Sequence, residues 1–458
     1  MDSEALAKRA VELCKQRGAD EADALVINKR ESASQVFYRD SSLAANSDTT
    51  RITIRLFRNH KGAIVTGRGV GEQTLESMIA QALAFANQSS RDKFLGLAEP
   101  DQLGRLQDDL EIYDQAIADL TIDEMEQTAM SLQSAVIARD SRIGSLVSST
   151  FQANTQEVTL CGSTGYCQTY KTTMGTLGTN AVLDNSFNEA SAEAANGESN
   201  KLVGGANLSN RTLKGLSIDR LADITIQKLA AKAGAKSASS GWLPVVFAPT
   251  SSRTLAGILL QFCSGPVAMY MEGSYFGKVG ELVCSPMITV IDDPIKPGGI
   301  KTLPFDHEGV VPRRKVIIRN GVFNEYLLNA YYGRALSRNS TGNAISTDDV
   351  RLGVAPSNAH IEPGASTPES IIADVRQGLY VTRLISRNMH VGSNFTQAAT
   401  GMWIEDGKLT HAVRAAIISA PLRDLYKNIA GCGNDVETDA PLAAPTLLVS
   451  KMNISPLA

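Results

Sequence analysis

The sequence predicts an α+β protein of two domains, with helices and an antiparallel sheet in the N-terminal domain and mostly antiparallel β-structure in the C-terminal domain. Apolar residues in the first half recur at helical spacing between segments that alternate like strands. Two strong hairpin turns mark the second half. A length of 458 residues exceeds that of a typical single domain.

Four helices are expected in the first half. Residues 4–17 carry apolar side chains at helical spacing and end before Gly18. The same spacing predicts a helix over 75–86. Thr121-Ile122-Asp123-Glu124 has the capping-box form that opens a third helix, and Ser217 is the predicted N-cap of a fourth.

Strands are expected between these helices. Residues 51–56 alternate polar and apolar, turn at Lys61-Gly62, and return through 63–66 as a hairpin. Residues 145–183 are rich in Thr, Tyr and Val and are typical of strands, whereas 185–217 form a polar stretch rich in Gly, Asn and Ser.

Small residues from Ala233 to Gly241 suit a linker between domains. The predicted boundaries are therefore 1–235 for the N-terminal α+β domain and 242–458 for the β-rich C-terminal domain.

Hairpin turns give the most secure local predictions of the second half. Asn-Gly and Asp-Gly accept the positive φ of a type I′ turn best. They occur at Asn320-Gly321 and Asp406-Gly407, each between segments of strand character. One helix stands out in this half, over 255–262 after caps at 250–252, and Pro266 is expected to end it.

Composition argues against several classes of partner. The formal charge of -4, from 44 basic and 48 acidic residues, gives no net attraction for nucleic acid or an anionic membrane. The densest basic cluster, Arg313-Arg314-Lys315, flanks a predicted strand and is interpreted as solvated. The start of the chain lacks signal-peptide character, and no apolar run could cross a bilayer.

The six cysteines form neither a disulfide framework nor a Cys-x-x-Cys pair, so we expect reduced, mostly buried thiols and a cytoplasmic location. Cys432, between two glycines and before Asn434-Asp435, has the most suggestive setting for function, but a catalytic thiol also needs a histidine beside it.

A self-contained helical zinc site is absent from the sequence. Such a site needs two imidazoles a turn apart and a carboxylate that activates water. No two of the five histidines (His60, His307, His360, His390 and His411) lie within five residues of each other. The segment most similar to such a zinc motif is Asp306-His307-Glu308-Gly309, and there we expect a loop that forms hydrogen bonds. Gly67-x-Gly69-x-Gly71 is interpreted as a turn, and nucleotide-binding and serine-hydrolase motifs are absent.

Five segments, taken together, resemble the TldD/PmbA family. They are Asp306 to Val310, the hairpin from Arg314 to Val322, Ser340 to Ala344, Gly401 to Gly407, and Asn428 to Asp435. One departure is local, because Thr396-Gln397-Ala398-Ala399 stands where the family usually has Ser-Arg-Gly-Ala. The resemblance implies a cytoplasmic α+β protein of two domains that forms dimers. One branch of the family carries His-Glu-x-x-x-His and is a metallopeptidase acting on peptides or unfolded chains, whereas the PmbA/TldE-like branch lacks these ligands.

The resemblance places this chain in the PmbA/TldE-like branch. The helix before Pro266 matches the zinc helix, and there Gln261, Phe262 and Pro266 replace the first His, the Glu base and the last His. The chain is then expected to bind no cofactor, and zinc is expected in a TldD-like partner. The remaining family segments supply candidate contacts for a peptide or a partner, namely His307, Glu308, Thr341, Asn343, Cys432, Asn434 and Asp435.

Three functions remain open at this stage. The leading hypothesis is a non-catalytic subunit of a zinc metallopeptidase that acts in proteolysis or peptide maturation and pairs with a TldD-like subunit. A second is a peptidase in its own right that uses dispersed residues such as His307, Glu308 and Cys432. A third is a homodimer that binds peptides or a partner such as gyrase, since the family was named for modulation of DNA gyrase.

Overall fold

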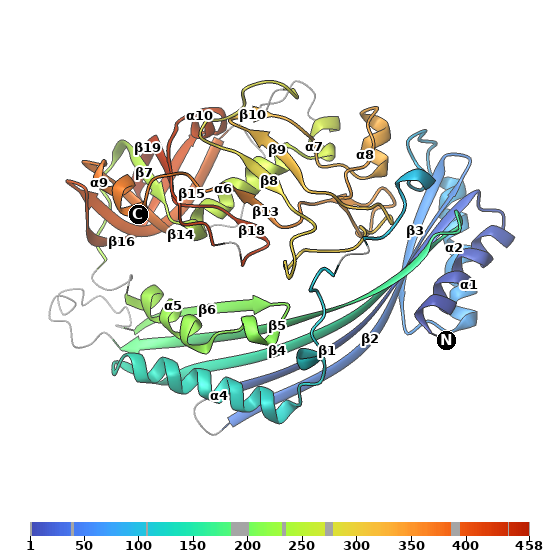
Figure 1. Cartoon of the computed structure of the whole chain (residues 1–458), viewed down its shortest axis with the longest axis horizontal. Helices are drawn as coiled ribbons and strands as arrows, with labels where there is room; N and C mark the ends of the chain where they lie inside the picture. Colours follow the sequence, from blue (N-terminus) through green and yellow to red (C-terminus); the bar gives the residue numbers. More distant parts are fainter. Residues whose placement is uncertain are drawn as a thin grey trace.

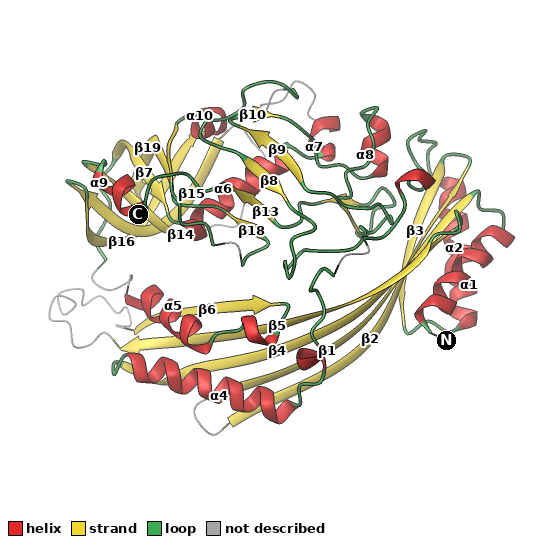
Figure 2. Cartoon of the chain, viewed as in Figure 1, coloured by secondary structure: helices red, strands yellow, loops and turns green. Residues whose placement is uncertain are grey.

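The structure is a computed structural model of the 458-residue chain, and the fold is α+β, as predicted. Figure 1 and Figure 2 show a long curved sheet below and a second body of shorter strands and helices above it. The structure describes residues 2–37, 41–106, 109–184, 201–230, 235–270, 278–385, 394–437 and 439–457. No helix within these residues is both long and apolar enough to cross a membrane.

The curved sheet is built wholly from the first half of the chain. Its six strands lie in the order β3-β2-β1-β4-β5-β6, and every neighbouring pair is antiparallel. The strands are β1 (Glu21–Phe37), β2 (Ser41–Arg58), β3 (Lys61–Arg68), β4 (Ile143–Gly162), β5 (Cys167–Asp184) and β6 (Lys201–Asn210).

Helices cover one face of this sheet at both of its ends (Figure 1). The helices formed by residues 3–16 and 72–88 pack on residues such as Ala24 and Ile54. The helices formed by residues 122–139 and 218–230 pack on residues such as Phe151 and Leu177. These side chains share one face because side chains alternate along a strand. The helices of the first half are α1 (Ser3–Gln16), α2 (Glu72–Gln88), α3 (Gln115–Ala118), α4 (Ile122–Arg139) and α5 (Ile218–Ala230), with 3-10 turns η1 (Pro100–Gln102) and η3 (Leu213–Gly215).

Five strands of the second half close into a ring, because β16 pairs with both β15 and β19. The order is β16-β15-β14-β7-β19, and β17 extends the sheet beyond β19. All neighbours in the ring are antiparallel except β7 and β14. The strands are β7 (Gly241–Phe247), β14 (Gln377–Leu384), β15 (Asn394–Glu405), β16 (Lys408–Pro421), β17 (Ile429–Cys432) and β19 (Leu447–Pro456).

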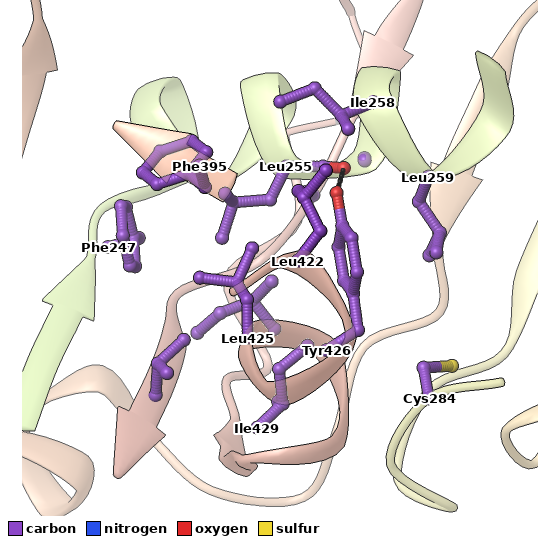
Figure 3. Packing of buried hydrophobic residues seen from close by; sticks show 14 of the residues in the cluster. Phe247, Leu255, Ile258, Leu259, Cys284, Phe395, Leu422, Leu425, Tyr426 and Ile429 are labelled. Carbon is purple, nitrogen blue, oxygen red and sulfur yellow. Dashed lines mark hydrogen bonds between the residues drawn. The ribbon is translucent and has the colours of Figure 1, made fainter. Parts of the chain in front are cut away.

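Helix α6 packs on the main core of this half. Leu255 and Leu259 lie beside Phe247, Leu425 and Tyr426, and the Tyr426 hydroxyl donates to the Leu255 carbonyl oxygen at 2.8 Å (Figure 3). The helices here are α6 (Pro249–Phe262), α7 (Gly265–Tyr270), α8 (Ala330–Ala335), α9 (Pro368–Ala373) and α10 (Leu422–Lys427).

A smaller five-stranded sheet, ordered β10-β9-β8-β13-β18, and a two-stranded pair complete this half. These strands are β8 (Val290–Asp292), β9 (Lys315–Arg319), β10 (Val322–Phe323), β11 (Ala344–Ile345), β12 (Gly353–Val354), β13 (Ala359–Ile361) and β18 (Leu442–Ala443).

The predicted helices and hairpins of both halves are present. The Thr121–Glu124 capping box is formed, and the Ser217 hydroxyl accepts the Arg220 N–H. The turn at Asn320-Gly321 has φ of 46° and 79°, and the turn at Asp406-Gly407 has φ of 45° and 74°. The first hairpin turns at Asn59-His60, two residues before the predicted Lys61-Gly62, and these residues adopt the positive φ.

The stretch at 185–217 is only partly as expected. Residues 201–210 form β6, although Gly and Asn are poor strand formers, because β6 pairs along its whole length with β5. Residues 185–200 lie outside the described part of the chain, as do 231–234 of the predicted linker and His390. At Lys236 the linker is bonded to β16, since its N–H donates to the Ala412 carbonyl oxygen. The predicted domain boundaries at 235 and 242 stay a prediction.

Not all cysteines are free thiols, which corrects the sequence-based expectation. Cys161 and Cys167 lie opposite each other across the β4–β5 hairpin and form a disulfide. Antiparallel pairing brought these two residues together, and their spacing of six in the sequence gave no sign of it. Cys14, Cys263, Cys284 and Cys432 are free and buried, as expected.

The capping box gives a direct test of the local fold. Thr121→Ala removes the hydroxyl that accepts the Glu124 N–H, so we expect the start of α4 to lose about 1 kcal/mol of local stability. Hydrogen exchange of the first-turn amides measures this effect. Ser131→Ala, in the middle of the same helix, is the control and should slow exchange or leave it unchanged, because Ala is the better helix former.

Candidate functional site

The segment predicted to match the zinc helix spans two helices. Helix α6 ends at Phe262, Cys263 caps it, and Pro266 lies in the first turn of α7. The expectation that Pro266 ends the helix is therefore wrong, since proline is well suited to the first turn of a helix. Gln261 and Pro266, which would carry the two imidazoles, do not lie on one helix.

The chemical character of this segment is apolar and tightly packed. Phe262 and Cys263 are buried in the main core, and burial raises the pKa of the Cys263 thiol well above its usual value. A side chain at Gly265 would place its Cβ 2.5 Å from the Tyr332 Cβ, so only glycine lets α7 approach α8. Among the described residues, no three His, Cys, Asp or Glu side chains gather as a metal site would need.

A cleft of about 560 Å³ opens beside this segment. Its wall at Tyr326 and Leu328 adjoins the segment, because Leu327 exchanges backbone hydrogen bonds with Cys263 and Gly265. We call it the Arg338 cleft. Its lining comprises Asp101, Gln102, Leu103, Val310, Val311, Arg313, Glu325, Tyr326, Leu328, Arg338, Asn339, Ser340 and Thr341.

Charge in the Arg338 cleft is mixed. The Arg313 guanidinium forms an ion pair with Glu325. The guanidinium carbon of Arg338 lies 5.7 Å from the centre of the Tyr326 ring, within cation–π range. In the described part of the chain, no carboxylate lies within ion-pair distance of Arg338, and Asp101 in the same lining is not bonded to it.

The loop that begins at Asp306 is held by its own carboxylate. Asp306 Oδ1 accepts the N–H groups of Glu308 at 2.9 Å and Val310 at 3.0 Å, and Oδ2 accepts that of Ala344 at 2.9 Å. Burial and the neighbouring Glu308 raise the pKa of Asp306 to about 7, against the three N–H donors, which lower it. Gly309 turns the chain with φ of 81°.

Glu308 joins this loop to the curved sheet. Its Oε1 accepts from Arg55 of β2 at 3.3 Å, and its Oε2 accepts the Ala330 N–H of α8 at 2.7 Å. Arg55 also forms an ion pair with Asp23 of β1, and all three side chains are buried. Burial lowers the pKa of Arg55, but the two carboxylates raise it overall. Burial raises the pKa of Glu308, and Arg55 opposes this effect.

The His307 ring bonds to the backbone. Its Nδ1 accepts the Ser346 N–H at 2.7 Å, which fixes the neutral tautomer with the proton on Nε2. Burial, with the cations Arg55, Lys301 and Arg51, lowers the pKa of His307 to about 4. The predicted role of His307 in loop hydrogen bonding is what the structure shows.

Thr341 and Asn343 belong to a second buried network. The Thr341 hydroxyl donates to Asn343 Oδ1 at 2.7 Å, and Asn343 Nδ2 donates to Asp292 at 2.9 Å. Lys315 pairs with the same Asp292 at 3.1 Å, and both side chains are fully buried. The expectation that Arg313, Arg314 and Lys315 are all solvated is therefore wrong for Lys315, whose charge is balanced inside the protein.

Cys432, Asn434 and Asp435 lie in a separate turn. The Cys432 thiol contacts the Glu362 carbonyl oxygen at 3.6 Å, and burial raises its pKa to about 11, so it is protonated at neutral pH. Asp435 accepts the N–H and hydroxyl of Thr446, and the Asn434 N–H donates to the Ser366 carbonyl oxygen.

Comparison with known proteins identifies the family. Residues 240–456 match the PmbA/TldA metallopeptidase C-terminal domain. A protein named Metalloprotease PmbA from Escherichia coli O157:H7 is 24% identical over 418 residues, which cover 90% of this chain and 86% of that protein. Residues 240–456 therefore carry a domain of the PmbA/TldD family, and most of the chain is similar to proteins named PmbA.

Solved structures of similar fold cover nearly the whole chain. A Bacteroides thetaiotaomicron protein named as a modulator of DNA gyrase aligns with a TM-score of 0.86 and 21% identity over 99% of this chain and 98% of that one. TldE from Thermococcus kodakarensis aligns with a TM-score of 0.80 and 18% identity over 98% of this chain and 99% of that one. At these identities the likeness establishes the shared fold.

The candidate contacts chosen from the PmbA/TldD segments fall into two groups. His307 and Glu308 lie in one loop, Thr341 and Asn343 lie close to it through Ala344, and all four side chains bond within the protein. Cys432, Asn434 and Asp435 form the other group. Contact of these residues with a peptide or partner stays a prediction.

Several important residues were missed by sequence reasoning. Arg55 was placed on the polar side of an alternating strand, but the second half of the chain covers that side. Asp23 gave a usable signal, since a lone carboxylate in the apolar run Ala22–Val26 needs a buried partner. Arg338 carried no signal in the sequence.

We expect Arg55→Gln to destabilise the protein by about 3–5 kcal/mol, because it leaves the Asp23 and Glu308 carboxylates buried without a counter-charge. Urea unfolding measures the loss. Arg68→Gln, on the exposed end of β3, is the matched control and should change the midpoint little. A small effect at Arg55 would show that water reaches the two carboxylates.

His307 should make stability sensitive to acid. Its folded pKa of about 4 lies below the ordinary value of 6.5, so the stabilising contribution is present above pH 6.5 and is lost as the pH falls toward 4. In His307→Asn, Oδ1 can still accept the Ser346 N–H, so the advantage of the wild type over this variant should shrink over the same interval. Thermal unfolding of both proteins between pH 8 and pH 4 measures it, and a constant difference would contradict the burial of a neutral ring.

Proposed function

We propose that this chain is the PmbA/TldE-like subunit of a cytoplasmic zinc metallopeptidase that acts in proteolysis or peptide maturation. In this proposal the chain is not catalytic, and a TldD-like subunit supplies the zinc ion. Curated relatives named metalloproteases support the family-level part of the proposal.

One observation carries the non-catalytic role. By the family resemblance, Gln261, Phe262 and Pro266 stand where the catalytic branch has its two zinc-binding imidazoles and the carboxylate that activates water. A buried Phe262 cannot accept a proton from water, and Pro266 offers no ligand atom. The division of the segment between α6 and α7 also removes the helical geometry that such a site needs.

The Arg338 cleft supports a role in handling substrate. It adjoins the altered zinc segment through the backbone bonds of Leu327, and its lining contains both apolar and polar groups. Clefts of this size and mixed lining are typical of sites for small ligands and short peptides. In this proposal the subunit, without a metal of its own, holds a peptide that the TldD-like subunit cleaves.

The proposal is tested by reconstitution. The purified chain should contain no stoichiometric zinc and cleave no peptide. Mixing it with a TldD-like subunit that carries His-Glu-x-x-x-His should give a complex with zinc and peptidase activity. As the matched control, a partner whose motif Glu is replaced by Gln should still assemble but lose activity, because the residual activity then reports on this chain alone. Zinc and cleavage in the isolated chain would refute the proposal.

A further inference from the structure

Arg338 is an arginine with no carboxylate within ion-pair distance among the described residues. Its side chain is exposed at the Arg338 cleft and lies against the Tyr326 ring at 5.7 Å. An aromatic ring orients a guanidinium but does not neutralise it. Arg313, on the same lining, is already paired with Glu325 at 3.2 Å. Arg338 is therefore the cation of this cleft that is available to a ligand.

The wall around Arg338 combines polar groups with apolar side chains. Gln102 uses its Oε1 to accept the Ser340 N–H at 3.2 Å, and Ser340 donates its hydroxyl to the Leu328 carbonyl oxygen at 3.3 Å. These bonds hold the polar wall in place. Leu103, Val311 and Leu328 provide apolar surface in the same lining.

The charge balance of the cleft selects the charge of its ligand. Arg313 and Arg338 are offset by Asp101 and Glu325, so the lining is close to neutral as a whole. A multiply charged anion such as a phosphate would be repelled by the two carboxylates. A single carboxylate can meet the guanidinium of Arg338 in the two-point geometry that arginine favours. Asp101 is then able to accept N–H groups of the same ligand.

We propose that the Arg338 cleft binds the free carboxyl terminus of an extended peptide, with Arg338 pairing with the terminal carboxylate. This inference rests on the proposed function, because it names the part of the substrate that the subunit holds. It gives the bound peptide a direction, because a peptide held by its carboxyl end offers only bonds upstream of that end to the TldD-like subunit.

The test compares two probes on the full chain, alone and in complex with the TldD-like subunit. The probes are dansyl-Gly-Ala-Ser-Ala-Ala with a free carboxyl terminus and the same peptide as its C-terminal amide. The free acid should bind at least tenfold more tightly than the amide, which matches the strength of a hydrogen-bonded ion pair. Fluorescence anisotropy measures both affinities.

Arg338→Gln should remove this preference, because it should weaken the binding of the free acid about tenfold and leave the binding of the amide unchanged. A general loss of structure would weaken both probes. Arg338→Lys should keep part of the preference, since it retains the charge without the planar fork. Arg319→Gln, at an exposed arginine outside the cleft, should behave as the wild type.

Equal affinity for the two peptides, or no binding of either, would overturn the inference. A preference that persists in Arg338→Gln would move the carboxylate site away from this cleft and would also overturn it. Assembly with the TldD-like subunit is measured on the same preparations. If the wild-type complex assembles but does not prefer the free acid over the amide, the result counts against this inference alone. Failure to assemble counts against the proposed function.

Discussion

Arg55 lies where the curved sheet meets the second half of the chain, and two carboxylates from opposite sides of that junction share its guanidinium. Asp23 comes from the sheet and Glu308 from the loop that leads to α8. Removing three charged groups from water is expensive, so this junction is stable only while all three are held together. The arrangement fixes the position of the loop, and through Asp306 and Ala344 it also fixes the wall of the second buried network.

The burial of charged groups also explains how much of the molecule could be predicted from the sequence. Local signals were sufficient for the capping box at Thr121 and for the turns at Asn320 and Asp406, because turn and cap chemistry depends on neighbouring residues. They were not sufficient for Arg55 or Lys315, because burial of a charge depends on what the rest of the chain brings against it. β6 was missed for a similar reason, since its neighbour β5 compensates for weak strand propensity.

The candidate site also has some features that could be predicted from the sequence and others that only the fold shows. The resemblance to the family predicts from the sequence alone that Gln261, Phe262 and Pro266 replace zinc ligands, whereas their separation between two helices could not be predicted. The close approach at Gly265 shows why this segment packs as core: Tyr332 occupies the space that a larger side chain would need. The Arg338 cleft is lined by residues 101–103 and by three segments between 310 and 341, and only the folded chain brings them together.

The closed ring of the second half has a consequence for how the protein is made. Strand β19 pairs with β7, the first strand of that half, and also with β16. During synthesis the curved sheet has all its strands once residue 210 has emerged, but the ring must wait for residues 447–456. Until then the edges of β7 and β16 that β19 covers are open to pairing with other chains. A chain that stops short of β19 would therefore keep two unpaired edges, and such a product is prone to aggregate.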